Sequence, residues 1–93
     1  MSEKHIVDKI RTYLRAQGFY VLKIHGGPTQ TAGIPDLLAI KDGRAWFFEV
    51  KTETGKASRL QIHTIEQLRS YGAVAEIVRS VADVETVLSG QPF

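Results

Sequence analysis

The sequence predicts a small α/β protein in which helices cover both faces of a mixed sheet. Two observations carry this prediction. An amphipathic helical pattern opens the chain, and a second one lies between the third and fourth apolar runs, so the expected order is α, β, β, β, α, β, α. The second helix permits a right-handed crossover between the last two strands. With 93 residues, the chain is expected to form a single domain with one core.

The composition limits the classes of protein to which the chain can belong. Hydrophobic residues make up 43% of the chain and charged residues 24%, as in ordinary globular domains. No run of 18 apolar residues and no signal-peptide pattern occurs, so we expect no membrane association and a cytoplasmic location. The absence of cysteine excludes disulfides and thiolate metal sites. The net charge of +2 permits nucleic-acid binding without requiring it.

The first helix is expected over residues 2–17. Its apolar positions recur at helical spacing, Ser2 is a plausible N-cap, and Gly18 is placed to end the helix. A strand over residues 19–25 follows, and then a loop over residues 26–35 with three glycines, two prolines and no charge. A loop of this length is either a surface excursion or an element that positions a substrate.

Two apolar strands joined by Asp42 and Gly43 come next. An Asp-Gly pair between apolar runs is typical of a hairpin with a two-residue loop. With these two residues in the loop, Lys41 faces Arg44. Each step away from the turn then pairs the preceding residue of the first strand with the following residue of the second strand. A bulge at the turn would shift this register by one residue.

The same register sets Asp36 opposite Glu49. Two like charges in facing positions are destabilising unless something lies between them. A hard divalent cation would turn this cost into a binding site, because it prefers carboxylate oxygens. Strand alternation also places Lys51 on the face of Glu49, so two carboxylates and one ammonium are expected to converge at one end of the hairpin.

The second half of the chain repeats the helix signals. Ser58 and Gln61 fit a capping box, and Gly72 ends the predicted helix. A short apolar strand over residues 73–78 follows. The last helix is expected to begin after the N-cap Ser80.

The run Pro35-Asp36 with Glu49-Val50-Lys51 on the next strand resembles the signature of the PD-(D/E)xK nuclease superfamily. The wider pattern Gly-Ile-Pro-Asp-Leu-Leu, Asp-Gly-Arg, Phe-Glu-Val-Lys and Gly-Lys-x-Ser-x-x-Gln resembles the VRR-NUC family in particular, in its stand-alone phage and bacterial type. This resemblance implies a restriction-endonuclease-like αβββαβ core, a single VRR-NUC-like nuclease domain over residues 1–93, and the cytoplasm of a phage host or bacterium as location.

The resemblance also implies a divalent-metal-dependent DNA endonuclease. Asp36 and Glu49 match the metal-binding acids of the family, and the backbone carbonyl of Val50 commonly completes that site. Glu3 matches an acid that many members carry on the first helix, although a charge that favours the helix dipole accounts for it equally. Mg²⁺ is the expected ion, and Mn²⁺ is expected to substitute for it, because both take oxygen ligands.

The implied catalytic set is Asp36, Glu49, Lys51 and Gln61. Lys51 matches the catalytic lysine, which would orient or deprotonate the attacking water or stabilise the charge that develops on the phosphate. Gln61 matches a glutamine on the helix that follows. For Gln61 the capping box is a complete structural account by itself, so both roles stay open.

One chain carries one site, and a two-fold dimer would present two, which suits branched or four-way junction DNA. We therefore expect a homodimer with structure-selective DNA cleavage. The side chains expected to bind DNA are Lys23, Thr29, Gln30, Lys56 and Arg59. The alternatives are a non-catalytic DNA-binding module with a nuclease fold and a restriction-type enzyme that reads one sequence.

Overall fold

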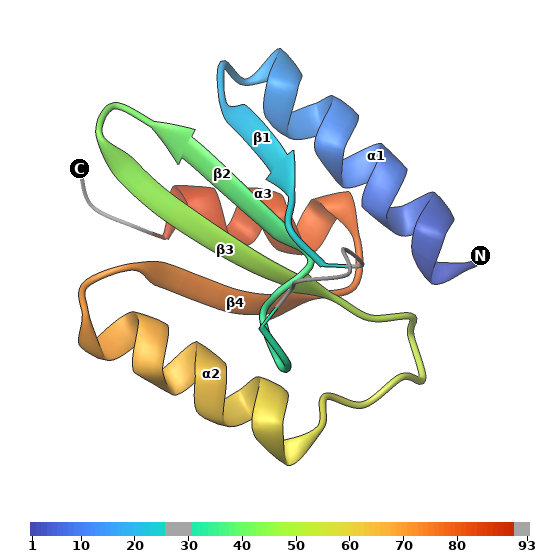
Figure 1. Ribbon diagram of the computed structural model, residues 1–93. Helices are drawn as coiled ribbons and strands as arrows, with labels where there is room; N and C mark the ends of the chain where they lie inside the picture. Colours follow the sequence, from blue (N-terminus) through green and yellow to red (C-terminus); the bar gives the residue numbers. More distant parts are fainter. Residues whose placement is uncertain (26–30, 91–93) are drawn as a thin grey trace.

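The computed structural model describes residues 1–25 and 31–90, and in this part of the chain it contains one mixed sheet of four strands in the order β1-β2-β3-β4 (Figure 1). The strands are β1 (Tyr20–Lys23), β2 (Leu37–Lys41), β3 (Arg44–Val50) and β4 (Val74–Val78). The first three form an antiparallel meander, and β4 lies parallel to β3.

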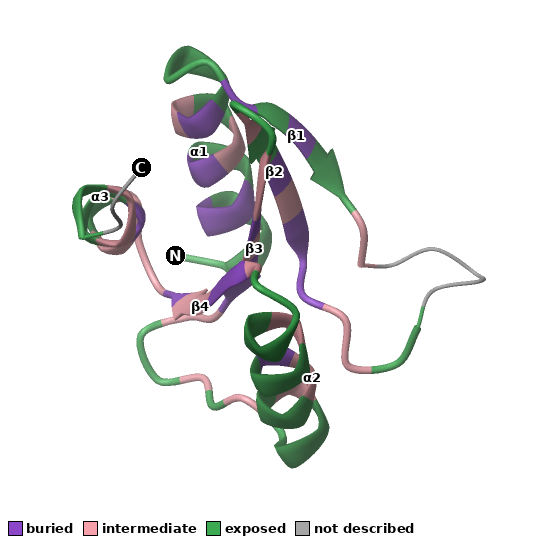
Figure 2. Cartoon of the chain, turned by 90° about the vertical axis from the view of Figure 1, so that its left-hand side faces the viewer, coloured by how far each residue is buried: buried purple, intermediate pink, exposed green. Residues whose placement is uncertain are grey.

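Three helices accompany the sheet in the described part of the chain, namely α1 (Glu3–Ala16), α2 (Arg59–Ser70) and α3 (Val81–Ser89). Figure 2 shows α1 and α3 on one side of the sheet and α2 on the other. The chain order α1-β1-β2-β3-α2-β4-α3 and the layers agree with the predicted α/β class. Among the described residues, no helix is both long and apolar enough to cross a bilayer.

The core lies between the sheet and the pair α1 and α3. Alternate residues of β2 and β3 point into it, and the helices contribute their apolar stripes. Its fully buried members include Ile10, Leu14, Leu37, Phe48 and Val84. Because Leu37 and Phe48 face this core, their neighbours Asp36 and Glu49 face the side that α2 covers.

All three predicted N-caps are present. The hydroxyl oxygen of Ser2 accepts from the backbone N–H of His5 at 3.2 Å, and Ser80 accepts in the same way from Asp83 at 3.1 Å. Ser58 caps α2, where the complete capping box forms. The caps explain why the helices begin where the sequence placed them.

The hairpin has the predicted register. Asp42 and Gly43 have positive φ values of 53° and 75°, as a type I′ two-residue loop requires. Lys41 pairs with Arg44, and the ladder continues in step to Leu37, so no bulge shifts the strands. The first strand is shorter than predicted, because β2 begins only at Leu37, the partner of Lys23.

On the α2 side, no described helix covers the part of the sheet formed by β1 and the end of β2 near the hairpin turn. The helix α2 contacts β4, whereas Tyr20, Leu22 and Ile40, on β1 and β2, are 65%, 38% and 37% exposed. Tyr20 pairs with Ile40, so these side chains lie on the same face. These three side chains form an uncharged surface, and strand alternation places Asp36 on the same face of the sheet.

Candidate active site

The end of the hairpin away from its turn carries two buried acids. Asp36 directly precedes β2 and is 5% exposed, and Glu49 lies near the end of β3 and is 2% exposed. Acidic side chains are rarely buried unless they are paired or bind a metal. The ladder of β2 and β3 pairs Leu37 with Phe48. Asp36 and Glu49 are the next positions along the two strands, so they face each other as predicted.

Asp36 joins the three antiparallel strands at this end. Its side-chain Oδ2 accepts from the backbone N–H of Val50 at 2.8 Å, and so extends the contact with β3. Its backbone carbonyl accepts from the N–H of Ile24 at 2.9 Å, just beyond β1. Both bonds hold the carboxylate close to Glu49.

Glu49 has partners on one of its two oxygens. Lys51 Nζ lies 3.4 Å from Oε2, and Gln61 Nε2 donates to the same oxygen at 3.2 Å. Within the described part of the chain, Oε1 is buried and has no hydrogen-bond partner. A buried oxygen without a donor is costly, and a bound cation would satisfy it.

Electrostatics at the pair favour the protonated form of Glu49. Burial, followed by the negative charge of Asp36, raises the pKa of the Glu49 carboxyl from 4.5 to about 7, although Lys51 opposes the rise. Two adjacent carboxylates with one ammonium leave an excess of negative charge. The residues present thus fit a divalent cation by both donor type and charge.

Gln61 closes the predicted capping box and also contacts one of the buried acids, while its catalytic role stays a prediction. Its side-chain oxygen accepts from the backbone N–H of Ser58 at 2.9 Å and closes the capping box, in which Ser58 Oγ accepts from the Gln61 N–H at 3.1 Å. Its side-chain nitrogen donates to Glu49. The first turn of α2 is therefore tied directly to the buried acids.

The segment that leads into Asp36 packs closely on α2. Gly33 has a φ of +80°, and a Cβ atom there would lie 2.7 Å from Leu60 Cγ and 2.9 Å from Thr64 Oγ1. Only glycine permits both this conformation and this approach. The close contact sets Asp36 and Gln61 relative to each other.

Arg79 supports the turn that follows Lys51, a role that the sequence analysis did not predict. Its Nη1 donates to the backbone carbonyls of Thr52 and Gly55, the latter at 2.6 Å. Every residue has a backbone carbonyl, so the identity of a residue does not show that its carbonyl accepts a hydrogen bond. The acceptors also lie far from Arg79 in the sequence. No sequence signal could therefore have identified Arg79 for this role.

Among the other predicted site residues, some are exposed and some lie outside the described part of the chain; Lys23 pairs with the core-facing Leu37, on the opposite face of the sheet from the acids. Lys23, Lys56 and Arg59 are exposed, whereas Thr29 and Gln30 fall outside the described residues. Glu3 is exposed in the first turn of α1. Among the described residues, no three His, Cys, Asp or Glu side chains gather into a group able to hold a metal. Glu3 and the carbonyl of Val50 thus stay predicted ligands.

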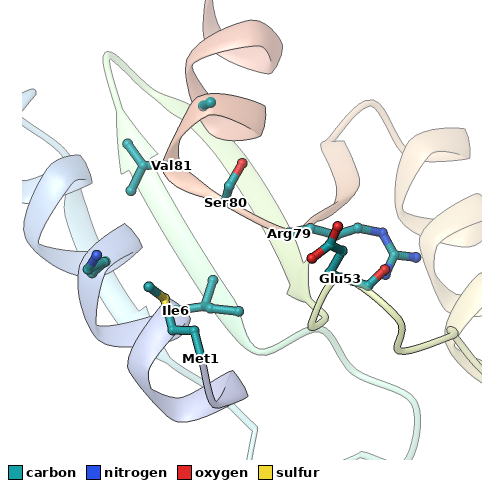
Figure 3. A pocket seen from close by; sticks show the side chains of 8 residues that line it. Met1, Ile6, Glu53, Arg79, Ser80 and Val81 are labelled. Atoms are coloured by element: carbon teal, nitrogen blue, oxygen red, sulfur yellow. The ribbon is translucent and has the colours of Figure 1, made fainter.

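A cavity of about 450 Å³ lies elsewhere, between the start of α1, the start of α3 and the turn held by Arg79 (Figure 3). Met1, Ile6, Glu53 and Val81 are among its lining residues. Neither Asp36 nor Glu49 lines it. The chemistry of the buried acids therefore belongs to the open end of the hairpin and not to this cavity.

Comparison with known proteins gives one family and a shared fold. A family model described as archaeal Holliday junction resolvase (Hjc) matches residues 4–84. A solved structure named as a VRR_NUC domain is 28% identical, with a TM-score of 0.79 and a match over 97% of each chain. Another, named as a VRR_NUC domain protein, is 22% identical, with a TM-score of 0.75 over 97% of this chain and 87% of that chain, and shows the fold alone. No curated protein matches the chain.

Proposed function

The chain belongs to the archaeal Holliday junction resolvase (Hjc) family, and on that premise we propose that it is a divalent-metal-dependent endonuclease that cuts branched DNA as a homodimer. Family membership and the VRR_NUC fold confirm the coarser prediction of a PD-(D/E)xK-like nuclease that acts on DNA. The stand-alone phage or bacterial type remains a prediction. The observation that carries the proposal is the buried pair Asp36 and Glu49, in which Glu49 Oε1 has no hydrogen-bond partner among residues 1–25 and 31–90.

The proposed metal ligands are Asp36, Glu49 and the backbone carbonyl of Val50. Glu49 Oε1, which meets no donor in the described part of the chain, supports this assignment, because a buried carboxylate oxygen of this kind is suited to a hard cation. Mg²⁺ is the proposed ion, with Mn²⁺ as a substitute. When bound, it would supply Lewis-acid polarisation of the scissile phosphate.

The remaining side chains of the site have distinct proposed roles. Lys51 presents its ammonium 3.4 Å from Glu49 Oε2, where it can offset the charge that develops on the phosphate or orient the attacking water. Gln61 donates to Glu49 and orients that carboxylate. Asp36 is oriented in turn by the N–H of Val50.

The substrate proposal rests on charge and on symmetry. Lys23, Lys56 and Arg59 are exposed cations that can contact phosphates. A four-way junction offers two symmetric strands, and a two-fold dimer offers two sites. The uncharged surface around Leu22 and Ile40 supports a dimer, because exposed apolar patches of this kind mark protein contacts.

A cleavage panel tests the proposal. Linear duplex, flap, splayed and four-way DNA are incubated with the full chain in Mg²⁺, in Mn²⁺ and in EDTA. We expect metal-dependent products from branched DNA, and loss of cleavage by about 100-fold or more in Asp36→Asn and Lys51→Ala, as for other groups that stabilise a transition state. Asp42→Asn is the matched control, because Asp42 is an exposed acid in the hairpin turn.

Two results would contradict the proposal. Cleavage at the wild-type rate by Asp36→Asn or Lys51→Ala excludes the assigned site. DNA binding in EDTA without product under any metal condition instead indicates the non-catalytic module. Sedimentation of the chain with four-way DNA tests the dimer, and a monomer bound at micromolar concentration would remove the two-site explanation of substrate choice.

A further inference from the structure

The amide of Gln61 can satisfy its two neighbours in only one orientation. Its oxygen faces the backbone N–H of Ser58 and its nitrogen faces the carboxylate of Glu49. A half-turn of the amide would set its oxygen against the carboxylate and its N–H groups against the N–H of Ser58. Both hydrogen bonds would then be lost. Ser58 therefore determines which end of the amide reaches Glu49.

The Ser58 N–H is itself held in place by the cap. Ser58 Oγ accepts from the backbone N–H of Gln61 at 3.1 Å, and the Ser58 carbonyl accepts from Ile62 at 3.0 Å. These bonds fix the backbone of Ser58 relative to the first turn of α2. The amide of Gln61 is thus oriented by a backbone N–H group at the start of the helix.

The orientation of Gln61 also determines which oxygen of Glu49 is left without a hydrogen-bond partner in the described part of the chain. Gln61 Nε2 and Lys51 Nζ both approach Oε2, at 3.2 Å and 3.4 Å. Two donors on one oxygen fix the carboxylate plane and leave the buried Oε1 without a partner among the described residues. The two donors on Oε2 therefore determine that Oε1 is the oxygen available to a cation.

We propose that the capping box of α2 is a positioning device for the metal site, in which Ser58 orients Gln61 and Gln61 presents Glu49 Oε1 to the cation. This inference rests on the proposed function, because it needs a cation at Glu49. It assigns a role to Ser58, which is placed neither on substrate nor on metal. Hydrogen-bond partners that orient metal ligands commonly change metal affinity by roughly 10- to 100-fold.

Calorimetric titration of the full chain with Mn²⁺ alone, without DNA, tests the proposal. Gln61→Leu removes both amide hydrogen bonds and leaves an apolar side chain that is one bond shorter, and we expect its Mn²⁺ affinity to fall by about 10-fold or more. Ser58→Ala keeps the backbone N–H but loosens the cap, so a loss of about 3- to 10-fold is expected, below the roughly 10- to 100-fold effect of losing a direct partner of a metal ligand. In metal-free protein, the NMR signals of the Gln61 side-chain NH₂ group should shift in Ser58→Ala.

Ser80→Ala is the matched control. Ser80 caps α3, on the other side of the sheet, by the same bond to a backbone N–H at 3.1 Å. Both serine variants lose one N-cap and a comparable amount of stability. Only Ser58→Ala should change Mn²⁺ affinity and the Gln61 NH₂ signals, provided that circular dichroism shows both variants folded at the temperature of the titration.

The outcomes separate this inference from the function on which it rests. Wild-type Mn²⁺ affinity in folded Gln61→Leu overturns the inference and leaves the metal site intact. Unchanged Gln61 NH₂ signals and equal affinities in Ser58→Ala and Ser80→Ala overturn the role of the cap. No Mn²⁺ binding by the wild-type chain overturns the metal site itself.

Discussion

The carboxyl of Glu49 should make the metal-free protein less stable as the pH rises. Its pKa is raised from 4.5 to about 7 in the folded chain, first by burial and then by the charge of Asp36. The folded state therefore binds this proton more tightly than the unfolded state does. The stabilisation that the proton provides is complete below the unfolded pKa and is lost as the pH rises through the folded pKa.

The size of the effect follows from the two pKa values. One pKa unit corresponds to about 1.4 kcal/mol, so a rise from 4.5 to about 7 sets an upper limit of about 3 kcal/mol. Glu49→Gln removes the ionisation and keeps an oxygen that can accept from Gln61. Between pH 5 and pH 8, the free energy of unfolding of this variant should rise relative to wild type by about 2 kcal/mol.

Urea unfolding in EDTA at these two pH values measures the effect. The fluorescence of Trp46 reports the transition, because this side chain is 1% exposed in the fold. Glu66→Gln is the control, since Glu66 is an exposed acid on α2 and its removal should leave the pH dependence unchanged. Excess Mn²⁺ should stabilise the wild type and leave Glu49→Gln unaffected.

A stability difference between Glu49→Gln and wild type that is equal at pH 5 and pH 8 would refute this reasoning. So would a difference that changes in the opposite direction. Either result would mean that burial and Asp36 do not hold a proton on Glu49. The electrostatic reason for a cation between the two acids would then disappear.

Two further substitutions test the supports of the site. Gly33→Ala should lower the free energy of unfolding by about 1–3 kcal/mol, because the new Cβ meets Leu60 Cγ at 2.7 Å and φ is positive. Urea unfolding measures this change. A variant as stable as the wild type would contradict the close contact. Arg79→Ala should cost about 1–3 kcal/mol by leaving the carbonyls of Thr52 and Gly55 without their donor. Recovery of stability in Arg79→Lys to the wild-type value would show that charge alone suffices.

The hairpin and the helix ends could be predicted because their signals are local. Asp42 and Gly43 supply the positive φ values of the turn, and the turn fixes the register that opposes Asp36 to Glu49. The caps follow from serines placed just before amphipathic runs. In each case, the residues that decide the structure are neighbours in the sequence.

The supports of the site could not be predicted because their partners are distant. Arg79 bonds backbone carbonyls, which every residue carries, and Gly33 is required by the position of Leu60 on α2. For Gln61 the sequence offered a cap or a site role as alternatives. The structure shows the cap together with a hydrogen bond to Glu49, because one amide has an acceptor end and a donor end.

The close approach of Gly33 to α2 also matters for protein engineering. The segment before Asp36 and the first turns of α2 are complementary surfaces, since a Cβ at Gly33 would fall within 2.9 Å of Thr64 Oγ1. Neither surface keeps its shape when the other is replaced. A designer who grafts this acid pair onto another scaffold must therefore transfer the loop and the helix as one block, and a hairpin alone would carry the acids without the geometry that orients them.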